Sequence, residues 1–148
     1  MFDPPTLDWV TQPWGLQNID WAALPLRIAL GVIFVDAGFG KWRRGIRGTG
    51  DWMDSLGIPF PHLAASAVAT LELVGGLLLL AGMLVSWVAI PLALNMLVAT
   101  YISKVKLQMS FQGGEKQGYE LNVILVAACV ALILLGAGPF SLDSLIYD

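Results

Sequence analysis

The chain contains four long apolar runs separated by shorter polar segments. The runs span about residues 21–42, 62–83, 86–105 and 118–137. Each is about 20 residues long, and a helix of that length, rising 1.5 Å per residue, crosses the roughly 30 Å hydrocarbon core of a bilayer. Only 13% of the residues are charged, whereas a soluble domain usually carries about 25%. The sequence therefore predicts an all-α membrane protein, a bundle of four transmembrane helices.

The basic residues indicate how these helices are oriented. Seven of the eight Lys and Arg residues lie around only two of the loops, which follow the first and third runs: Lys41, Arg43, Arg44, Arg47, Lys104, Lys106 and Lys116. Loops rich in Lys and Arg stay in the cytoplasm because these residues are translocated poorly. We therefore expect an up-down-up-down bundle in a bacterial-type inner membrane with both termini outside the cytoplasm. Residues 1–20 would form an extracytoplasmic segment and residues 21–148 the membrane domain.

The composition argues against several kinds of chemistry. The chain has one cysteine, Cys129, and one histidine, His62. A dithiol reaction needs two cysteines, and haem or zinc sites need ligand sets that are missing here. We expect no metal and no covalently bound cofactor, whereas a quinone or lipid remains possible. The divided basic loops do not favour nucleic acid but suit anionic headgroups, so membrane lipids are expected partners.

Ionisable residues inside the runs are the first candidates for function, because charges in a bilayer are costly and usually face the bundle interior. Arg27 in the first run lies about 9 Å from its outer edge, at 1.5 Å per residue. Glu72 in the second run and Asn95 in the third lie near the midplane. Since Arg27 has a long side chain, we predict an intramembrane polar cluster of Arg27, Glu72 and Asn95. Arg27 and Glu72 are also the candidate catalytic residues.

A second polar group is expected nearer the cytoplasm. It consists of Asp36, Lys41, Glu120 and Asn122. Asp36 and Lys41 are five residues apart on one helix and point in different directions, so a partner for Asp36 from the fourth run, or from Arg43 and Arg44, is expected. For both groups three roles stay open: fixing the helix register, serving a ligand or proton pathway, and docking onto helices of another protein.

Two short elements are predicted outside the runs. Residues 51–56 form an amphipathic turn that ends at Gly57 and would lie along the inner membrane surface. Residues 141–145 form a short capped helix on the outer side.

Several motifs follow one another along the chain. They are PLRIALGVIF at 25–34 with Gly38 and Lys41, LGIPFP at 56–61, LELVGGLLLLAG at 71–82, GYELN at 118–122 and SLD at 141–143. Together they resemble the DoxX family over about residues 25–145. The resemblance implies a four-helix integral membrane protein. The family takes its name from a subunit of a thiosulfate:quinone oxidoreductase, and other members look like membrane anchors in redox-stress assemblies.

Two functional hypotheses follow. The first is an accessory or anchoring subunit of a larger electron-transfer complex, with other membrane-protein subunits as partners. The alternative is the membrane subunit of a quinone- or sulfur-compound-linked oxidoreductase, such as a thiosulfate:quinone oxidoreductase. We favour a non-enzymatic role for this chain on its own and leave the question open. A small transporter ranks last, because four helices are few and no internal repeat is visible.

Overall fold

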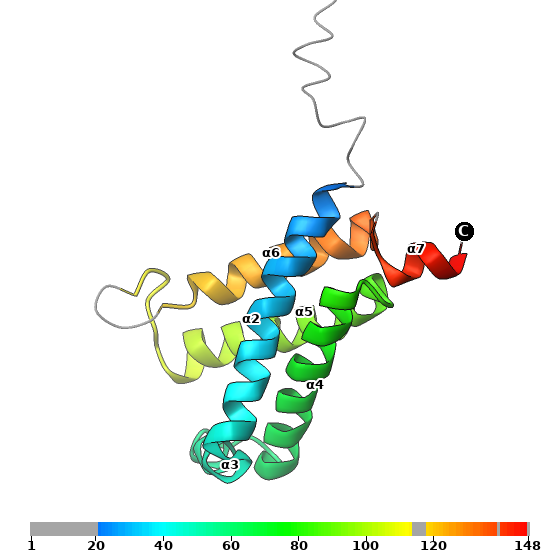
Figure 1. Cartoon of the computed structure of the whole chain (residues 1–148). Coiled ribbons are helices and arrows are strands. Elements are labelled where there is room, and N and C mark those ends of the chain that lie inside the picture. The colour runs from blue at the N-terminus through cyan, green and yellow to red at the C-terminus, as the bar shows by residue number, and fades with distance from the viewer. Residues whose placement is uncertain (1–20, 114–117, 139, 148) are drawn as a thin grey trace, which may run out of the picture.

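A computed structural model of the chain describes residues 21–113, 118–138 and 140–147. Its helices are α2 (Ala23–Arg44), α3 (Ile46–Ser55), α4 (Pro61–Ala81), α5 (Val85–Tyr101), α6 (Glu120–Leu135) and α7 (Leu142–Tyr147), and the π-helical turn η2 (Ile102–Lys106) extends α5 (Figure 1). The segment 1–20, predicted to be extracytoplasmic, lies outside the described residues.

The prediction of a helical membrane protein is confirmed. Among the residues that the structure describes, three helices are long and apolar enough to cross a membrane: Ala23–Arg44, Pro61–Ala81 and Val85–Lys106. The fourth, α6, is apolar but has 16 residues. At 1.5 Å per residue it is about 24 Å long, slightly short of a typical hydrocarbon core. The direction in which each helix crosses the membrane stays a prediction.

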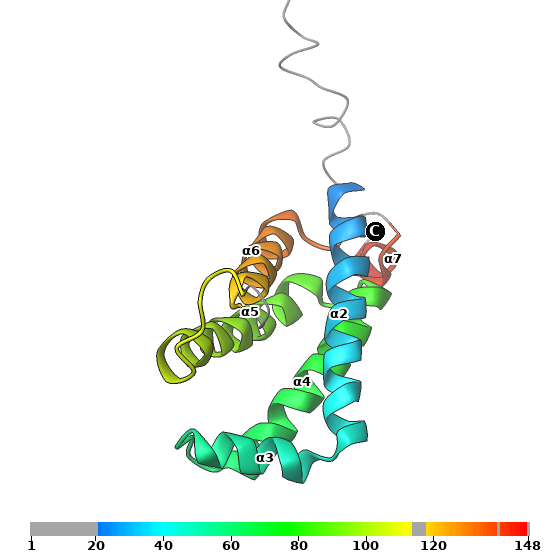
Figure 2. The same ribbon diagram turned by 90° about the vertical axis from the view of Figure 1, so that its left-hand side faces the viewer.

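The long helices form two pairs instead of one evenly packed bundle. Helix α2 packs mainly against α4, and α5 packs mainly against α6. The α5–α6 pair runs across the α2–α4 pair, and the two pairs meet near α7 and diverge toward α3 (Figures 1 and 2). One reason is the short turn between α4 and α5, at Gly82–Leu84, which holds the pairs together at one end only.

Glycines allow α2 and α4 to pack backbone against backbone. A Cβ atom at Gly38 would lie 2.5 Å from the backbone N of Leu73, and one at Gly76 would lie 2.7 Å from the backbone N of Val35. Neither distance leaves room for a side chain. The close contact of these two helices therefore depends on small residues, as is common between membrane helices.

The two short helices agree in part with the prediction. Helix α7 is capped as expected, because the backbone N–H of Ser144 donates to Ser141 Oγ at 3.0 Å. Helix α3 ends near Gly57, as predicted, but it begins at Ile46 and is longer than the predicted turn. On α3 the side chain of Met53 is buried against the protein while that of Trp52 is exposed.

Candidate functional site

Arg27 holds three segments together at the α7 end of the molecule. It lies in the second turn of α2, and only 2% of it is exposed. Its Nε donates to the carbonyl of Leu79 at 3.2 Å, its Nη2 to that of Phe140 at 3.0 Å, and its Nη1 to that of Ala137. Leu79 lies in the last turn of α4, where the backbone carbonyls carry partial negative charge, and Ala137 follows the end of α6 at Leu135. The guanidinium group therefore joins the end of α4 to the segment that follows α6.

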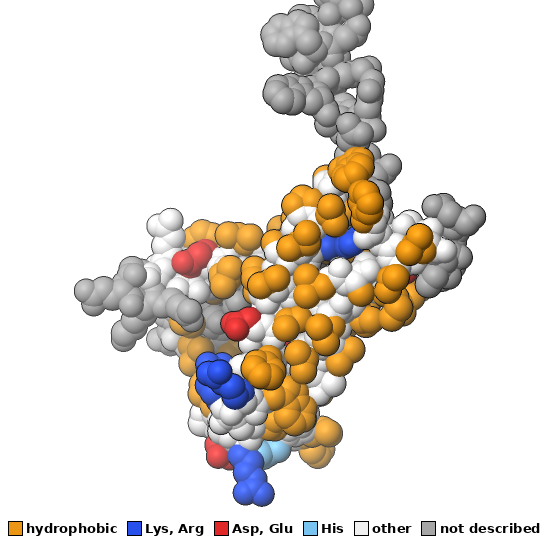
Figure 3. Space-filling view, viewed as in Figure 1, with side chains coloured by type: hydrophobic (Ala, Val, Ile, Leu, Met, Phe, Trp, Pro, Cys, Tyr) orange, Lys and Arg blue, Asp and Glu red, His pale blue; other side chains and the backbone are white. Residues whose placement is uncertain are grey.

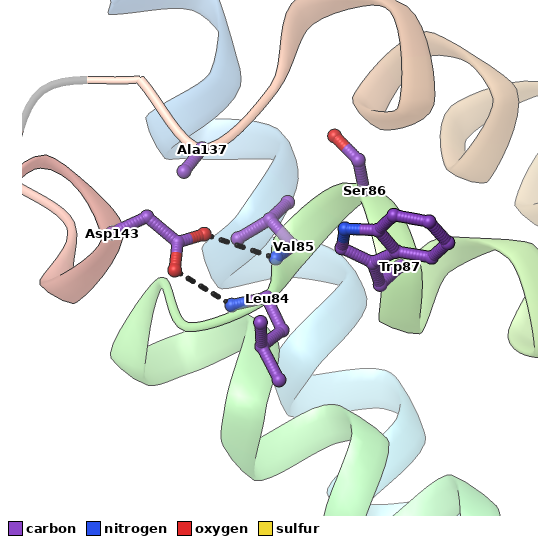
Figure 4. Close-up of a pocket in the computed structure, with 6 residues that line it drawn as sticks. All are labelled: Leu84, Val85, Ser86, Trp87, Ala137 and Asp143. Atoms are coloured by element: carbon purple, nitrogen blue, oxygen red, sulfur yellow. Dashed lines mark hydrogen bonds between the residues drawn. The ribbon is translucent and has the colours of Figure 1, made fainter. Parts of the chain in front are cut away.

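Asp143 binds the backbone N–H groups at the start of α5. Its carboxylate accepts the backbone N–H of Leu84 at 2.8 Å and that of Val85 at 3.2 Å (Figure 4). These N–H groups begin α5, where a negative charge is favourable. The backbone N–H of Asp143 also donates to the carbonyl of Gly82 at 3.0 Å. Helix α7 is thereby fixed to the turn between α4 and α5.

Gly82 links these two sets of contacts. A Cβ atom at this position would lie 2.8 Å from Cζ of Arg27 and 2.7 Å from Cβ of Ser141. We call Arg27, Gly82, Ser141 and Asp143 the outer cluster, after the side of the membrane on which the sequence predicts this end of the molecule. The sequence motif at 141–143 contained Asp143, but helical spacing offers no sign that a residue after α6 reaches back to the start of α5.

Glu72 is the centre of a separate polar group in the membrane domain. It is 3% exposed, its Oε2 forms an ion pair with Lys41 Nζ, and its Oε1 accepts from Asn95 Nδ2 at 3.1 Å. We call Lys41, Glu72 and Asn95 the midplane cluster, after the depth that the sequence predicts for Glu72 and Asn95. Its members come from α2, α4 and α5, so it joins the two helix pairs below the α4–α5 turn.

The expected contact between Arg27 and Glu72 is therefore absent from the structure. Arg27 binds the carbonyl of Leu79, which places it level with the end of α4. Glu72 lies seven residues earlier on α4, about 10 Å along the helix axis at 1.5 Å per residue. Asn95 does lie beside Glu72, but Lys41 supplies the positive charge that we expected from Arg27.

The second predicted group is also divided. Lys41 belongs to the midplane cluster, whereas Asp36 is exposed on α2 and forms no ion pair with any described residue, including Arg43 and Arg44. Glu120 begins α6 as expected, and its Oε2 atom is buried without a hydrogen-bond partner among the residues described. Asn122 is half-buried two residues further on, about half a turn around the helix. These four residues do not form one site.

The remaining reactive side chains offer no assembled centre. Cys129 is fully buried in the core, and His62 is bonded to Asp51 at 3.0 Å on the exposed end of α4. Within residues 21–113, 118–138 and 140–147 no group of three His, Cys, Asp or Glu side chains could hold a metal ion. The outer cluster borders a cavity of about 240 Å³, to which Asp143 contributes (Figure 4).

Comparison with known proteins agrees with this architecture. The DoxX family model matches residues 22–105. The "Putative oxidoreductase CatD" of Bacillus subtilis (strain 168) is 30% identical over 131 residues, which cover 88% of this chain and 91% of that protein. The "Inner membrane protein YphA" of Escherichia coli (strain K12) is 31% identical over 119 residues, 79% of this chain and 84% of that protein. No solved structure matches the chain.

Proposed function

Because the chain belongs to the DoxX family, we propose that it is a multi-pass inner-membrane subunit that anchors or supports a partner in a larger electron-transfer complex. One relative is named as an inner membrane protein and another as an oxidoreductase, which supports this location and this class of partner. The arrangement of the charged side chains supports an accessory role.

The observation that carries the proposal is the exposure of Asp36. Val32, Asp36 and Phe39 follow one another at i, i+4 and i+7 on α2, and all three are exposed. Asp36 lies eight residues before Arg44, about 12 Å from the end of the helix at 1.5 Å per residue. A carboxylate at that depth is costly against lipid, whereas a hydrogen-bond donor or basic group of another membrane helix would offset the cost.

The interior polar residues are already used within the chain. Arg27 is bonded to three carbonyls, and Glu72 is bonded to Lys41 and Asn95. These contacts tie helices together, which is the role expected of structural polar groups in a bundle. Asp36 differs because it faces outward. We therefore assign the α2 face of Val32, Asp36 and Phe39 to a partner helix that carries a basic or donor side chain.

Purification in a mild detergent from native membranes tests the proposal. The wild-type chain is expected to co-elute with a second membrane protein in a fixed ratio, and the Asp36→Asn variant is expected to lose it. Asp54→Asn is the matched control, because Asp54 is an exposed carboxylate on α3. If the Asp36→Asn variant retains the same partners as wild type, or if wild type elutes alone, the proposed docking face is wrong.

A direct role in quinone chemistry is the second candidate, favoured by the name of the Bacillus subtilis relative. It predicts that the purified chain binds a quinone and that Arg27→Met or Glu72→Gln weakens binding. Neither the cavity beside Asp143 nor a second cavity, which Lys41 and Arg44 line next to α3, is lined by Arg27 or Glu72. Unchanged quinone binding by both variants would exclude this site.

A further inference from the structure

A cavity of about 340 Å³ lies between the end of α2 and α3. It is lined by Lys41, Arg44, Gly45, Gly48, Thr49 and Trp52. Two of these residues are cationic, one carries a hydroxyl donor and one is aromatic. The exposed side chains of Arg43 and Arg47 lie on the same short stretch of chain and add to the positive charge. Lys41 is also the cation of the midplane cluster, where it pairs with Glu72, so Arg44 is the cationic lining residue that has no ion-pair partner among the described residues. The cavity belongs neither to the outer cluster nor to the face of Asp36.

We propose that this cavity binds the phosphate group of an anionic phospholipid such as phosphatidylglycerol. Arg44 is exposed and forms no ion pair with any described residue, so its guanidinium group is free to form paired hydrogen bonds with phosphate oxygens. Asp51, the nearest acidic residue along the chain to Thr49, is bonded to His62 and is not among the residues that line the cavity. Basic pockets on the cytoplasmic side of membrane proteins favour such headgroups.

The surroundings of the cavity fit a lipid better than a soluble phosphate compound. Trp42 and Trp52 are both exposed near it, and Trp side chains favour the headgroup level of a bilayer. Lys and Arg side chains lie beside hydrophobic ones at the α3 end of the molecule (Figure 3).

Two glycines that line the cavity, Gly45 and Gly48, leave space next to the backbone. A Cβ atom at Gly45 or at Gly48 would meet no atom within 4 Å. Gly48 lies within α3 and has no positive φ angle, so a larger side chain there is compatible with the helix. The Cβ atom of a leucine at this position would meet no neighbour, and we expect the rest of its side chain to enter the cavity that Gly48 lines. Gly48→Leu is therefore a test that fills the site but preserves the fold.

Native mass spectrometry of the full-length protein in detergent, titrated with phosphatidylglycerol or phosphatidylcholine, tests the proposal. Wild type is expected to bind phosphatidylglycerol at least about fivefold more tightly, the effect of roughly one basic residue near a headgroup. Gly48→Leu and Arg44→Gln should each remove most of this preference. Lys104→Gln, which removes an exposed charge outside the cavity, should keep it.

Three outcomes would overturn the proposal. Wild type could show no preference between the two lipids, or both cavity variants could bind phosphatidylglycerol as wild type does, or Lys104→Gln could reduce the preference equally. Titration with sn-glycerol 3-phosphate distinguishes a lipid from a soluble ligand. If sn-glycerol 3-phosphate competes only weakly, the ligand is a lipid. If it binds as tightly as phosphatidylglycerol, the proposal of a lipid ligand is overturned in favour of a soluble phosphate compound. Thermal unfolding of each variant shows whether the fold is kept.

Discussion

At the scale of single residues, three charged side chains bind backbone groups at helix ends or pair with one another. Arg27 binds a carbonyl in the last turn of α4 and two carbonyls after α6, Asp143 accepts from the N–H groups at the start of α5, and Glu72 pairs with Lys41. The sequence identified Arg27, Glu72 and Asn95 as unusual, because charge and amide groups stand out in apolar runs. The sequence could not show which groups they contact, because a long side chain such as that of Arg27 can reach residues at several depths in the membrane. Two of the residues that Arg27 binds, Ala137 and Phe140, also lie outside the helices, where helical spacing does not locate them.

The first prediction concerns Arg27. Arg27→Lys keeps the positive charge but cannot bond three separated carbonyls with the same planar geometry, so we expect the free energy of unfolding to fall by about 2–4 kcal/mol. Arg27→Met should lower it further. Arg47→Lys, at an exposed position, is the control. Denaturation in mixed detergent micelles, followed by circular dichroism, measures the change. Equal stability of Arg27→Lys and wild type would contradict this role.

The second prediction concerns the ion pair of Lys41 and Glu72. Lys41→Met leaves a carboxylate that is 4% exposed without its cation, and we expect a loss of about 2–4 kcal/mol. Glu72→Gln should cost less, because an amide oxygen can still accept from Asn95. In the double variant the two losses should not add, since both changes remove the same interaction. A double-mutant cycle in the same denaturation assay measures this, and strict additivity would show that the pair is not coupled.

At the scale of elements, the apolar runs predicted the bounds of the first two long helices closely. Helix α3, which lies between two runs, was predicted poorly, because only residues 51–56 were expected to form a turn. The predicted runs at 21–42 and 62–83 became Ala23–Arg44 and Pro61–Ala81. For α3, Gly48 and Gly50 argued for a loop, because glycine disfavours helices. In the structure a Cβ atom at Gly50 would lie 2.6 Å from Cδ2 of His62. Glycine is thus required there for packing on α4, which local propensity cannot reveal.

The third prediction concerns the contact of α2 with α4. Gly38→Ala places a methyl group against the backbone of Leu73, so we expect the helices to separate and the free energy of unfolding to fall by about 1–3 kcal/mol. Gly40→Ala is a control on the same helix, because its nearest neighbour would be the flexible end of Arg44 at 3.4 Å. It should be neutral or slightly stabilising, since alanine favours helices. If both variants have the same stability, close packing at Gly38 is not important.

At the scale of the whole molecule, the sequence predicted the number of apolar helices but not their arrangement. Four runs joined by short links favoured an up-down-up-down bundle, whereas the structure forms the pairs α2–α4 and α5–α6. The difference arises from contacts that are distant in sequence. Gly38 and Gly76 draw α2 onto α4, and the outer cluster ties both pairs together at one end. Charge distribution along the chain predicts which end faces the cytoplasm independently of this packing.

The last prediction concerns that orientation. We expect α3 on the cytoplasmic side and α7 on the outer side, because the basic loops adjoin α3 and η2. Single cysteines introduced by Ser55→Cys on α3 and Leu145→Cys on α7 place a thiol at exposed positions on opposite ends. Cys129 adds little background because it is fully buried. A membrane-impermeant thiol reagent applied to spheroplasts should label the Leu145→Cys variant at once and the Ser55→Cys variant only after the membrane is opened. The reverse order would show that the chain crosses the membrane in the opposite sense.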